Sequence, residues 1–418
     1  MPDTPPAADL DLAQAVIAHI DEARLVQLVQ EVCRIPSVLG EEGPLARHLV
    51  DTMRRSGFAG VRAQEVLPAR PNAIGHLDFG PRPTDGPTVV LTGHMDTKPV
   101  SHGWTVAEPF SGDIVDGAVY GHGIMDMKAA LACQIVAIEA LRSAQLPIQG
   151  RVAMAAVSDH MGEQLGSIRY FEEHGADYCV LGELSDNEIF VGHRGRYYFD
   201  VVVRGVSAHT CHKSLAVNAN MLAAHAIIEL DASRLEPALD DRVSSLFGPE
   251  TFMSPGRVYG GLPPGGPSMI PDECVVRIDC RPQPGVSVQT VRAEVERCLA
   301  VAREREPRLR AEIVLADVKS GYLASEDDEV TMLMRRAVHS VRGHEPGVGV
   351  AGWLGDTASF GDRIPTVIFG PGGEPVYCPN EHLSIDDIVE AARVYAAFCA
   401  YALASDQTTR SSTSRELP

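Results

Sequence analysis

Imidazole and carboxylate side chains follow short apolar runs of this sequence, at the points where predicted strands end. The run Thr88–Gly93 leads directly into His94 and Asp96, and the run Tyr178–Gly182 leads into Glu183. In open α/β sheets, ligands bind outside the carboxyl ends of the strands. A mixture of imidazole and carboxylate groups at that edge suits zinc, which takes nitrogen and oxygen ligands at about 2.0–2.2 Å. The sequence therefore predicts a metal site.

Two further side chains of the same chemistry belong with these. The glycine-rich loop Gly121–Lys128 places Asp126 just before a predicted helix, Met127–Ser143, and His382 lies in a loop near the C-terminus. Each residue alone is weak evidence, because a polar residue at a strand end is usually a cap or a satisfied core group. Their joint occurrence in this order favours a functional site.

The elements that must position these residues indicate two domains, as the length of 418 residues also suggests. Short apolar runs between helical stretches predict an α/β domain in which helices cover a mainly parallel sheet. These runs are Thr88–Leu91, Arg151–Val157, Tyr178–Leu181 and Thr366–Phe369. Within residues 196–318, the order strand-helix-strand-strand-helix-strand predicts a smaller inserted α+β domain. Residues 1–195 and 319–418 then form the metal-binding catalytic domain.

Charge and hydropathy narrow the classes of partner. Acidic residues outnumber basic ones 56 to 36, a formal net charge of -20, so the phosphate backbone of a nucleic acid would be repelled. No apolar run approaches the ~20 residues of a membrane span, and the N-terminus does not resemble a secretory signal. The nine cysteines form no C-x-x-C pair, as expected of reduced thiols. We expect a cytoplasmic protein that acts on a small molecule, without nucleic-acid or membrane partners.

Taken together, the motifs resemble those of a zinc metallopeptidase and deacylase family that includes acetylornithine deacetylase, succinyl-diaminopimelate desuccinylase, aminoacylase and glutamate carboxypeptidase. The resemblance covers nearly the whole chain. It rests on Gly93–Thr97, on the segment Trp104–Lys128, on Leu181–Glu183 and on His382. It implies that the metal ligands are His94, Asp126, Glu183 and His382. It also implies that Asp126 bridges two zinc ions and that the carboxylate of Asp96 orients His94.

The inserted domain resembles the lid and dimerisation domain of the same family. The resemblance of Gly205–His209 implies a homodimer in which His209 reaches the neighbouring subunit's site and stabilises the oxyanion. Asn218 and Arg281 match positions that hold the substrate's carboxylate end, a task suited to the planar guanidinium of arginine. Gly355 matches a substrate-side loop. The residues by themselves also allow a helix cap for Asn218 and an ion pair on a strand for Arg281.

One motif departs from the family pattern. Where the family has an aspartate followed by two glutamates, one the general base and one a zinc ligand, this chain has Asp159, His160 and Met161. A thioether is a poor zinc ligand among oxygen and nitrogen donors. We therefore expect one tight zinc site and a second site, at His382, that is weakened; cobalt or manganese are alternatives to zinc. Glu163 is a less favoured substitute for the missing carboxylate.

The same departure affects the general base. Proton transfer by such a base typically contributes roughly 10²–10⁴-fold in rate. His160 can perform it, because imidazole titrates near neutral pH. His160 could equally be a substrate-binding residue or an inert one.

The leading interpretation is a zinc-dependent hydrolase that cleaves an amide bond in an N-acyl amino acid or small peptide-like substrate with a free carboxylate. Zinc would activate water and polarise the carbonyl, while His160 shuttles the proton and His209 stabilises the oxyanion. One alternative is a family member recruited to acyl transfer or condensation, or a catalytically impaired homologue. Another is a binding protein that retains the pocket, which is disfavoured because a mere binder has little use for the oxyanion histidine.

Overall fold

The computed structural model describes residues 7–261 and 268–404, which divide into two units. Unit 1 holds the described parts of Met1–Val191, Ala324–Gly349 and Ser359–Pro418, and unit 2 consists of the described parts of Gly192–Leu323 and Val350–Ala358. The junctions expected after residues 195 and 318 lie a few residues from these boundaries. The short segment Val350–Ala358 groups with unit 2, although it was expected in the catalytic domain.

A nine-stranded sheet, most of whose strands belong to unit 1, follows the order β1-β2-β6-β3-β7-β17-β8-β15, with β16 paired to β8. Strands β6, β3, β7 and β17 run parallel to one another, whereas β1 and β2 pair antiparallel at one edge. This confirms the predicted mainly parallel α/β fold. The strands are β1 (Ala59–Leu67), β2 (Arg70–Phe79), β3 (Thr88–His94), β6 (Gly150–Val157), β7 (Tyr178–Leu181), β8 (Ile189–His193), β15 (Tyr322–Leu323), β16 (Val348–Ala351) and β17 (Thr366–Ile368).

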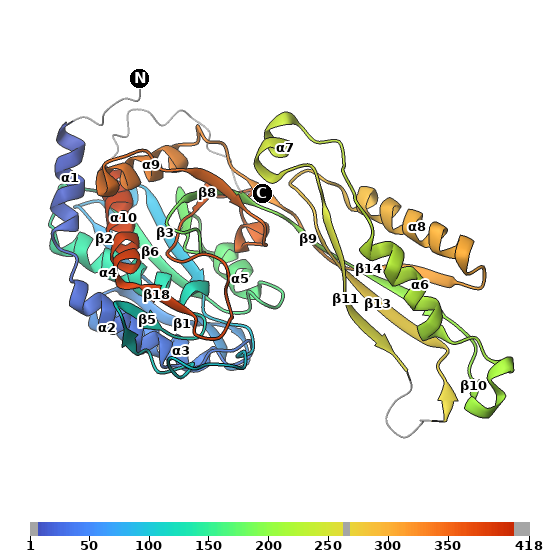
Figure 1. Cartoon of the computed structure of the whole chain (residues 1–418). Coiled ribbons are helices and arrows are strands. Elements are labelled where there is room, and N and C mark those ends of the chain that lie inside the picture. Colours follow the sequence, from blue (N-terminus) through green and yellow to red (C-terminus); the bar gives the residue numbers. More distant parts are fainter. Residues whose placement is uncertain (1–6, 262–267, 405–418) are drawn as a thin grey trace. The chain divides into compact units, whose positions relative to one another are not determined.

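Helices cover both faces of this sheet (Figure 1). Val90 of β3 packs in a cluster with Tyr170 and Phe171 of α5. Gly93 is an odd number of residues further along β3, so it faces the opposite side, where a Cβ on it would approach Leu131 of α4 within 3.1 Å. The helices of unit 1 are α1 (Ala7–Ile17), α2 (Glu22–Cys33), α3 (Gly43–Arg55), α4 (Ala129–Ser143), α5 (Leu165–Glu173), α9 (Glu329–Arg342) and α10 (Ile385–Ala404). In the described part of the chain, no helix is long and apolar enough to cross a membrane.

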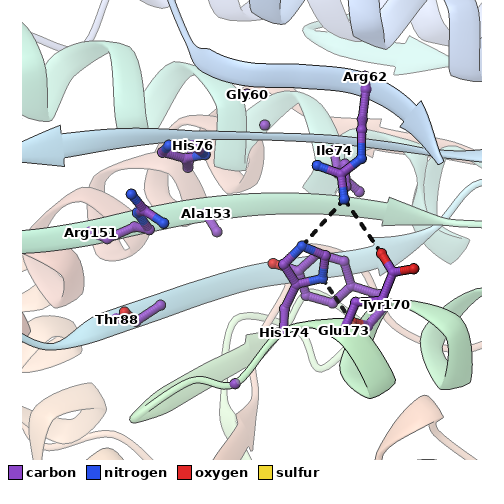
Figure 2. A pocket seen from close by; sticks show the side chains of 12 residues that line it. Gly60, Arg62, Ile74, His76, Thr88, Arg151, Ala153, Tyr170, Glu173 and His174 are labelled. Atoms are coloured by element: carbon purple, nitrogen blue, oxygen red, sulfur yellow. Dashed lines mark hydrogen bonds and ion pairs between the residues drawn. The ribbon is translucent and has the colours of Figure 1, made fainter. Parts of the chain in front are cut away.

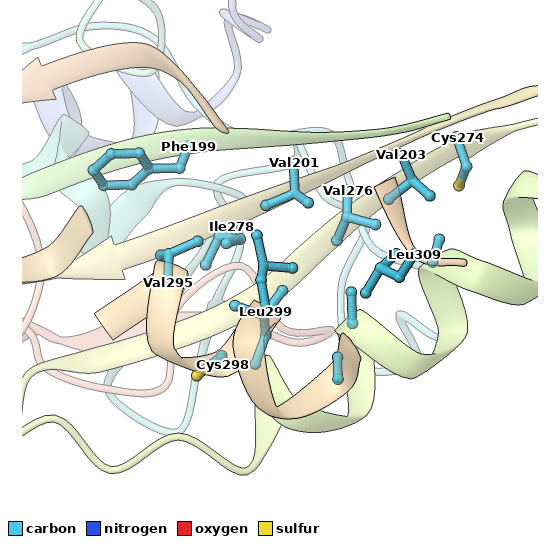
Figure 3. Close-up of a cluster of buried hydrophobic side chains, with 14 of the residues drawn as sticks. Phe199, Val201, Val203, Cys274, Val276, Ile278, Val295, Cys298, Leu299 and Leu309 are labelled. Carbon is cyan, nitrogen blue, oxygen red and sulfur yellow. The ribbon is translucent and has the colours of Figure 1, made fainter. Parts of the chain in front are cut away.

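Unit 2 is built on an antiparallel sheet of four strands in the order β11-β13-β9-β14. Alternate residues of β9 are buried, and its Phe199, Val201 and Val203 pack with Val295 and Leu299 of α8 in one apolar cluster (Figure 3). The order of the main elements along the chain is the predicted one: β9 (Arg196–Arg204), α6 (Ala219–Asp231), β11 (Phe252–Gly260), β13 (Glu273–Arg281), α8 (Val288–Arg305) and β14 (Arg310–Lys319).

Candidate metal centre

The parallel pairing of β3 and β7 brings the first two predicted ligands to one edge of the sheet. Thr92 of β3 lies opposite Leu181 of β7, so both strands end close together. His94 is the last residue of β3, and Glu183 follows β7 by two residues. Both side chains are buried. The sequence prediction that these strand ends share one site agrees with this register.

A short helical turn at Ile124–Lys128 presents Asp126 to the same place. The turn closes through the Lys128 N–H, which donates to the Gly123 carbonyl at 3.1 Å. Gly123 has a φ of +71°, and a Cβ there would lie 2.3 Å from the Thr97 side chain, so only glycine fits. The buried Asp126 carboxylate thereby reaches His94, with Oδ1 2.8 Å from Nε2.

The position of the proton on the His94 ring follows from the hydrogen bond that its Nδ1 makes. Nδ1 lies 2.9 Å from the main-chain oxygen of Asp96. A carbonyl oxygen only accepts hydrogen bonds, so Nδ1 carries a proton and Nε2 of the neutral ring keeps a lone pair. That lone pair faces the carboxylate oxygens of Asp126 and, at 3.5 Å, of Glu183. Nε2 therefore faces a carboxylate oxygen of each residue, and an extra proton or a cation would stabilise these contacts.

The donor set fits a divalent metal ion. Ligand atoms that sit 2.0–2.1 Å from a tetrahedral ion are about 3.3 Å from one another, close to the 3.5 Å between His94 Nε2 and Glu183 Oε1. Glu183 Oε1 is buried and accepts no hydrogen bond from any described residue, although buried carboxylate oxygens are normally satisfied. A metal ion would satisfy it.

The electrostatics of the centre also call for positive charge. Burial alone favours neutral His94, but the carboxylates of Glu183 and Asp126 outweigh it and raise the pKa of His94 well above its usual range. Burial raises the pKa of the Glu183 carboxyl. Burial would do the same to Asp126, yet the adjacent His94 ring lowers the pKa of the Asp126 carboxyl. The two carboxylates therefore favour positive charge at this position.

His160 belongs to this cluster as well. Its ring stacks on that of His94, with centroids 4.2 Å apart and planes at 10°, and its Nε2 lies 3.7 Å from Glu183 Oε1. Of the described residues, His94, His160 and Glu183 form the group whose ligand atoms lie close enough together to hold one metal ion. The residue expected to act as a base therefore lies among the candidate ligands. The predicted ligand Asp126 contacts His94 but lies outside this group.

Asp96 holds the backbone that carries His160. Its carboxylate accepts hydrogen bonds from the N–H groups of His160 at 3.1 Å and Met161 at 2.7 Å. The contact of Asp96 to His94 is made by its main-chain oxygen. In this structure, the main-chain oxygen of Asp96 therefore orients His94 by accepting a hydrogen bond from its ring, while the Asp96 carboxylate fixes the loop that carries His160 and Met161. The Glu163 side chain is exposed, and its N–H donates to Asp159.

His382 is not brought together with the other predicted ligands. It is exposed at the start of β18 (His382–Ser384), its Nδ1 lies 2.9 Å from the Asn380 carbonyl, and its ring stacks on Tyr120. The C-terminal side chain that contacts the centre is Tyr377, whose hydroxyl donates to the main-chain oxygen of Asp126 at 3.1 Å. Sequence reasoning missed Tyr377. A lone tyrosine carries no metal signature, and only its place in the same segment as His382 could have drawn attention to it.

Glu381 is a second residue that the sequence did not reveal. Its buried carboxylate accepts hydrogen bonds from the N–H groups of Gly123, Met125 and Tyr377, at 3.1–3.2 Å. Burial raises the pKa of Glu381 to about 7. This carboxylate ties the loop of Asp126 to the C-terminal segment and thereby helps to fix the centre.

The residues predicted to contact substrate lie in unit 2 and make local contacts there. His209 ends β10 (Ala208–His209), is exposed, and accepts a hydrogen bond from the Cys211 N–H. Asn218 caps α6, and Arg281 pairs with Asp279 at 2.8 Å. The Gly355 carbonyl accepts from the Ala358 N–H. The cap and the ion pair are the plainer roles that the sequence allowed; neither excludes a substrate contact, and the substrate roles stay predictions.

A pocket of about 260 Å³ in unit 1 contains none of the predicted site residues (Figure 2). Its charged side chains are paired: Arg62 lies 3.4 Å from Glu173 and 3.5 Å from His174, and Arg151 pairs with Asp78 at 2.7 Å. Paired, half-exposed charges of this kind do not form a reactive centre. The candidate chemistry therefore stays with the buried cluster around His94.

Known proteins resemble this chain over most of its length. The model of peptidase family M20/M25/M40 matches residues 90–401. A succinyl-diaminopimelate desuccinylase of Nitrosospira multiformis is 28% identical over 363 residues, covering 83% of this chain and 90% of that protein. The enzyme of the same name from Gluconobacter oxydans is 27% identical over 395 residues, covering 89% of this chain and 96% of that protein.

Solved structures share the fold. The di-peptidase Dug1p from Saccharomyces cerevisiae has a TM-score of 0.77 at 15% identity and covers 94% of this chain and 99% of its own. Human carnosine dipeptidase 1 has a TM-score of 0.73 at 19% identity, with the same coverage. The YXEP protein of Bacillus subtilis, a dinuclear metal-binding peptidase, has a TM-score of 0.63 at 17% identity and covers 92% and 99%.

Proposed function

Because this chain belongs to peptidase family M20/M25/M40, we propose that it is a zinc-dependent hydrolase of the amide bond in an N-acyl amino acid or small peptide-like substrate. The observation that carries the proposal is the convergence of His94 Nε2 with carboxylate oxygens of Asp126 and Glu183 in a buried place. Hydrolysis adds one water across the amide and releases a carboxylate and an amine. Bound zinc would supply the polarisation of the carbonyl and the activation of water.

The proposed substrate class has two sources of support. The curated relatives named above are desuccinylases, enzymes that act on an acylated amino acid. Arg281 and Asn218 would hold the free carboxylate of the substrate, since a guanidinium pairs with both oxygens of such a group. Gly355 would shape the loop beside them. We propose zinc because imidazole and carboxylate donors suit it, with cobalt or manganese as the alternatives.

The chain's own residues would divide the work. His94, Asp126 and Glu183 would hold the metal. The Asp96 carboxylate fixes the loop of His160 by accepting hydrogen bonds from the N–H groups of His160 and Met161. His160 can either take the proton from water or add to the ligands, because its Nε2 faces Glu183.

We also propose that the chain forms a homodimer through unit 2. Strand β11 is an edge of its sheet, and an unpaired edge can join another chain. Exposed apolar side chains lie along β11 and α6: Phe252, Val258, Tyr259, Met221 and Ile228, each at least 50% exposed. Burial of this apolar surface would favour association. His209 of the partner subunit would then stabilise the oxyanion of the tetrahedral intermediate.

A cytoplasmic location is the remaining part of the proposal. All nine cysteines are free thiols, and seven of them are buried. Cytosolic proteins keep their thiols reduced, because the glutathione and thioredoxin systems oppose disulfide formation. Exposed Cys211 would be the thiol most open to oxidation in another compartment.

A substrate panel tests the function. Purified protein, supplied with zinc, is offered N-succinyl, N-acetyl and dipeptide substrates, and the released amine is measured. Release that is lost with a chelator, regained with zinc and absent from Glu183→Gln would support the proposal. If no substrate is cleaved by the wild type, but the double variant His160→Glu with Met161→Glu cleaves one, the non-hydrolytic alternative is favoured instead.

A further inference from the structure

We propose that the pocket lined by β1, β2, β6 and α5 of unit 1 binds a small phosphate monoester through Arg62, Arg151 and Tyr170 (Figure 2). The site lies apart from the candidate metal centre. Thr88, which lines the pocket, begins β3, whereas His94 ends the same strand, and a strand of this length spans about 20 Å. The proposal concerns a binding site and does not rest on the proposed hydrolysis.

The lining of the pocket favours an anion, in a chain whose formal net charge is -20. Its basic lining residues are Arg62, His76, Arg151 and His174. Glu173 is the one carboxylate among the described lining residues. Both of its oxygens already have close partners, because Oε1 lies 2.6 Å from Arg169 and Oε2 lies 2.6 Å from Gln64. Its negative charge is therefore shared with groups that do not line the pocket.

Each of the two arginines keeps an unused edge. Among the described residues, Arg62 makes hydrogen bonds only through Nη2, which lies 3.4 Å from Glu173 and 3.5 Å from His174. Both distances are long for a hydrogen bond. Arg151 binds Asp78 through Nε at 2.7 Å and Nη2 at 3.0 Å, so its Nη1 has no partner in the described part of the chain. Two guanidinium groups from separate strands can therefore donate to one anion in the pocket.

Tyr170 adds a hydroxyl donor to the same place. The residue is only 3% exposed, and its hydroxyl makes no hydrogen bond with any described residue, although buried polar groups are normally satisfied. Burial raises the pKa of the Tyr170 hydroxyl, and the charges of Arg62 and Arg151 oppose this effect. The hydroxyl is therefore protonated near neutral pH and lies where both guanidinium charges act on it. It can donate to an anion that the two arginines hold.

The donors and the volume of the pocket define the class of ligand. One guanidinium can pair with both oxygens of a carboxylate, whereas a phosphate monoester carries three acceptor oxygens and a charge of about −1.5 to −2 at pH 7. Two guanidinium groups and a hydroxyl suit the phosphate. The volume of about 260 Å³ lies below the roughly 300–1,000 Å³ of sites for drug-sized ligands, so the ligand is small. Ile74 and Ala153 line the pocket with apolar surface, against which the carbon atoms of an ester can pack.

Isothermal titration calorimetry of the full-length chain with glycerol 3-phosphate tests the assignment. Arg62→Gln should weaken binding about 10-fold or more, because hydrogen bonds between charged groups are the strong ones. Tyr170→Phe, which removes a single neutral donor, should weaken it about threefold or more. The matched control is Arg54→Gln, which changes another arginine of unit 1 with a side chain 58% exposed, against 50% for Arg62. This control should bind the probe like the wild type.

The remaining comparisons identify the ligand and the place where it binds. Inorganic phosphate should bind more weakly than glycerol 3-phosphate, and succinate more weakly still. Removal of metal by dialysis against a chelator should leave the affinity unchanged; loss of binding on metal removal would place the anion at the metal centre instead. No saturable binding to the wild type, tighter binding of succinate or inorganic phosphate, or equal affinities of the wild type and Arg62→Gln would overturn the assignment. These measurements need no turnover, so a failure of the proposed hydrolysis is distinguishable from a failure of this site.

Discussion

The imidazole rings of His94 and His160 stack with their centroids 4.2 Å apart and their planes 10° from parallel. His94 ends a central strand, and His160 follows the neighbouring strand β6, with which β3 pairs in parallel. The register of these two strands therefore places His160, one of the two residues that depart from the family pattern, directly over His94, a predicted ligand.

The first prediction concerns the number of metal ions. We expect one tightly bound zinc per chain, because Met161 offers a thioether, His382 is exposed, and the hydroxyl of Tyr377 contacts Asp126. Elemental analysis of protein purified without chelator measures this directly. Two zinc ions per chain at full occupancy would show that a second set of ligands exists.

The second prediction concerns Tyr377. Replacement by phenylalanine removes the hydrogen bond to the Asp126 main-chain oxygen, and a lost hydrogen bond typically lowers the free energy of unfolding by about 1 kcal/mol. Denaturant unfolding of metal-free protein is the appropriate measurement. The control is Tyr120→Phe, in which the ring stacked on His382 is kept. An unchanged stability of Tyr377→Phe, or an equal loss in both variants, would contradict a specific role of this hydroxyl.

Much of the fold and half of the site could be predicted from sequence, for physical reasons that differ between elements. Strand β7 and helix α8 could be predicted from the local pattern of their apolar residues. The hairpin of β1 and β2 was not predicted, because most of β1 is exposed and its strand pairing depends on contacts outside the segment. The ligands at strand ends follow from topology.

The remaining site residues depend on distant contacts. His382 lies beside Tyr120 because β18 pairs with β5 (Ala118–Tyr120). No periodic pattern of apolar residues in the sequence predicts that strand pairing. Tyr377, in the segment before β18, contacts the main-chain oxygen of Asp126. The contact of His160 with Glu183 likewise joins segments that follow different strands. Residue type identified the candidates, but only the packing of the loops separates a ligand from its neighbour.

The third prediction concerns the ionic support beneath the His160 loop. Arg70 binds the buried Glu42 at 2.6 Å and Asp159 at 2.7 Å. Arg70→Ala leaves the Glu42 carboxylate buried without this partner, a change that typically lowers the free energy of unfolding by about 3–5 kcal/mol. Arg54→Ala, which removes an exposed pair with Asp51, should change it by less than about 1 kcal/mol. Denaturant unfolding measures both variants. Similar losses of unfolding free energy in Arg70→Ala and Arg54→Ala would contradict the expected effect of the buried Glu42 carboxylate.

The last prediction concerns His209 and the proposed dimer. If His209 acts in the neighbouring subunit's site, His209→Ala and Glu183→Gln should each be inactive alone, yet a mixture whose subunits have exchanged should regain part of the activity. In such a heterodimer, the site with intact metal ligands receives the intact His209 from the Glu183→Gln chain. Val258→Lys, which places a charge on the exposed β11 edge, should yield a monomer by light scattering and lose activity. A monomeric protein with full activity, or no recovery on subunit exchange, would mean that His209 does not act across an interface.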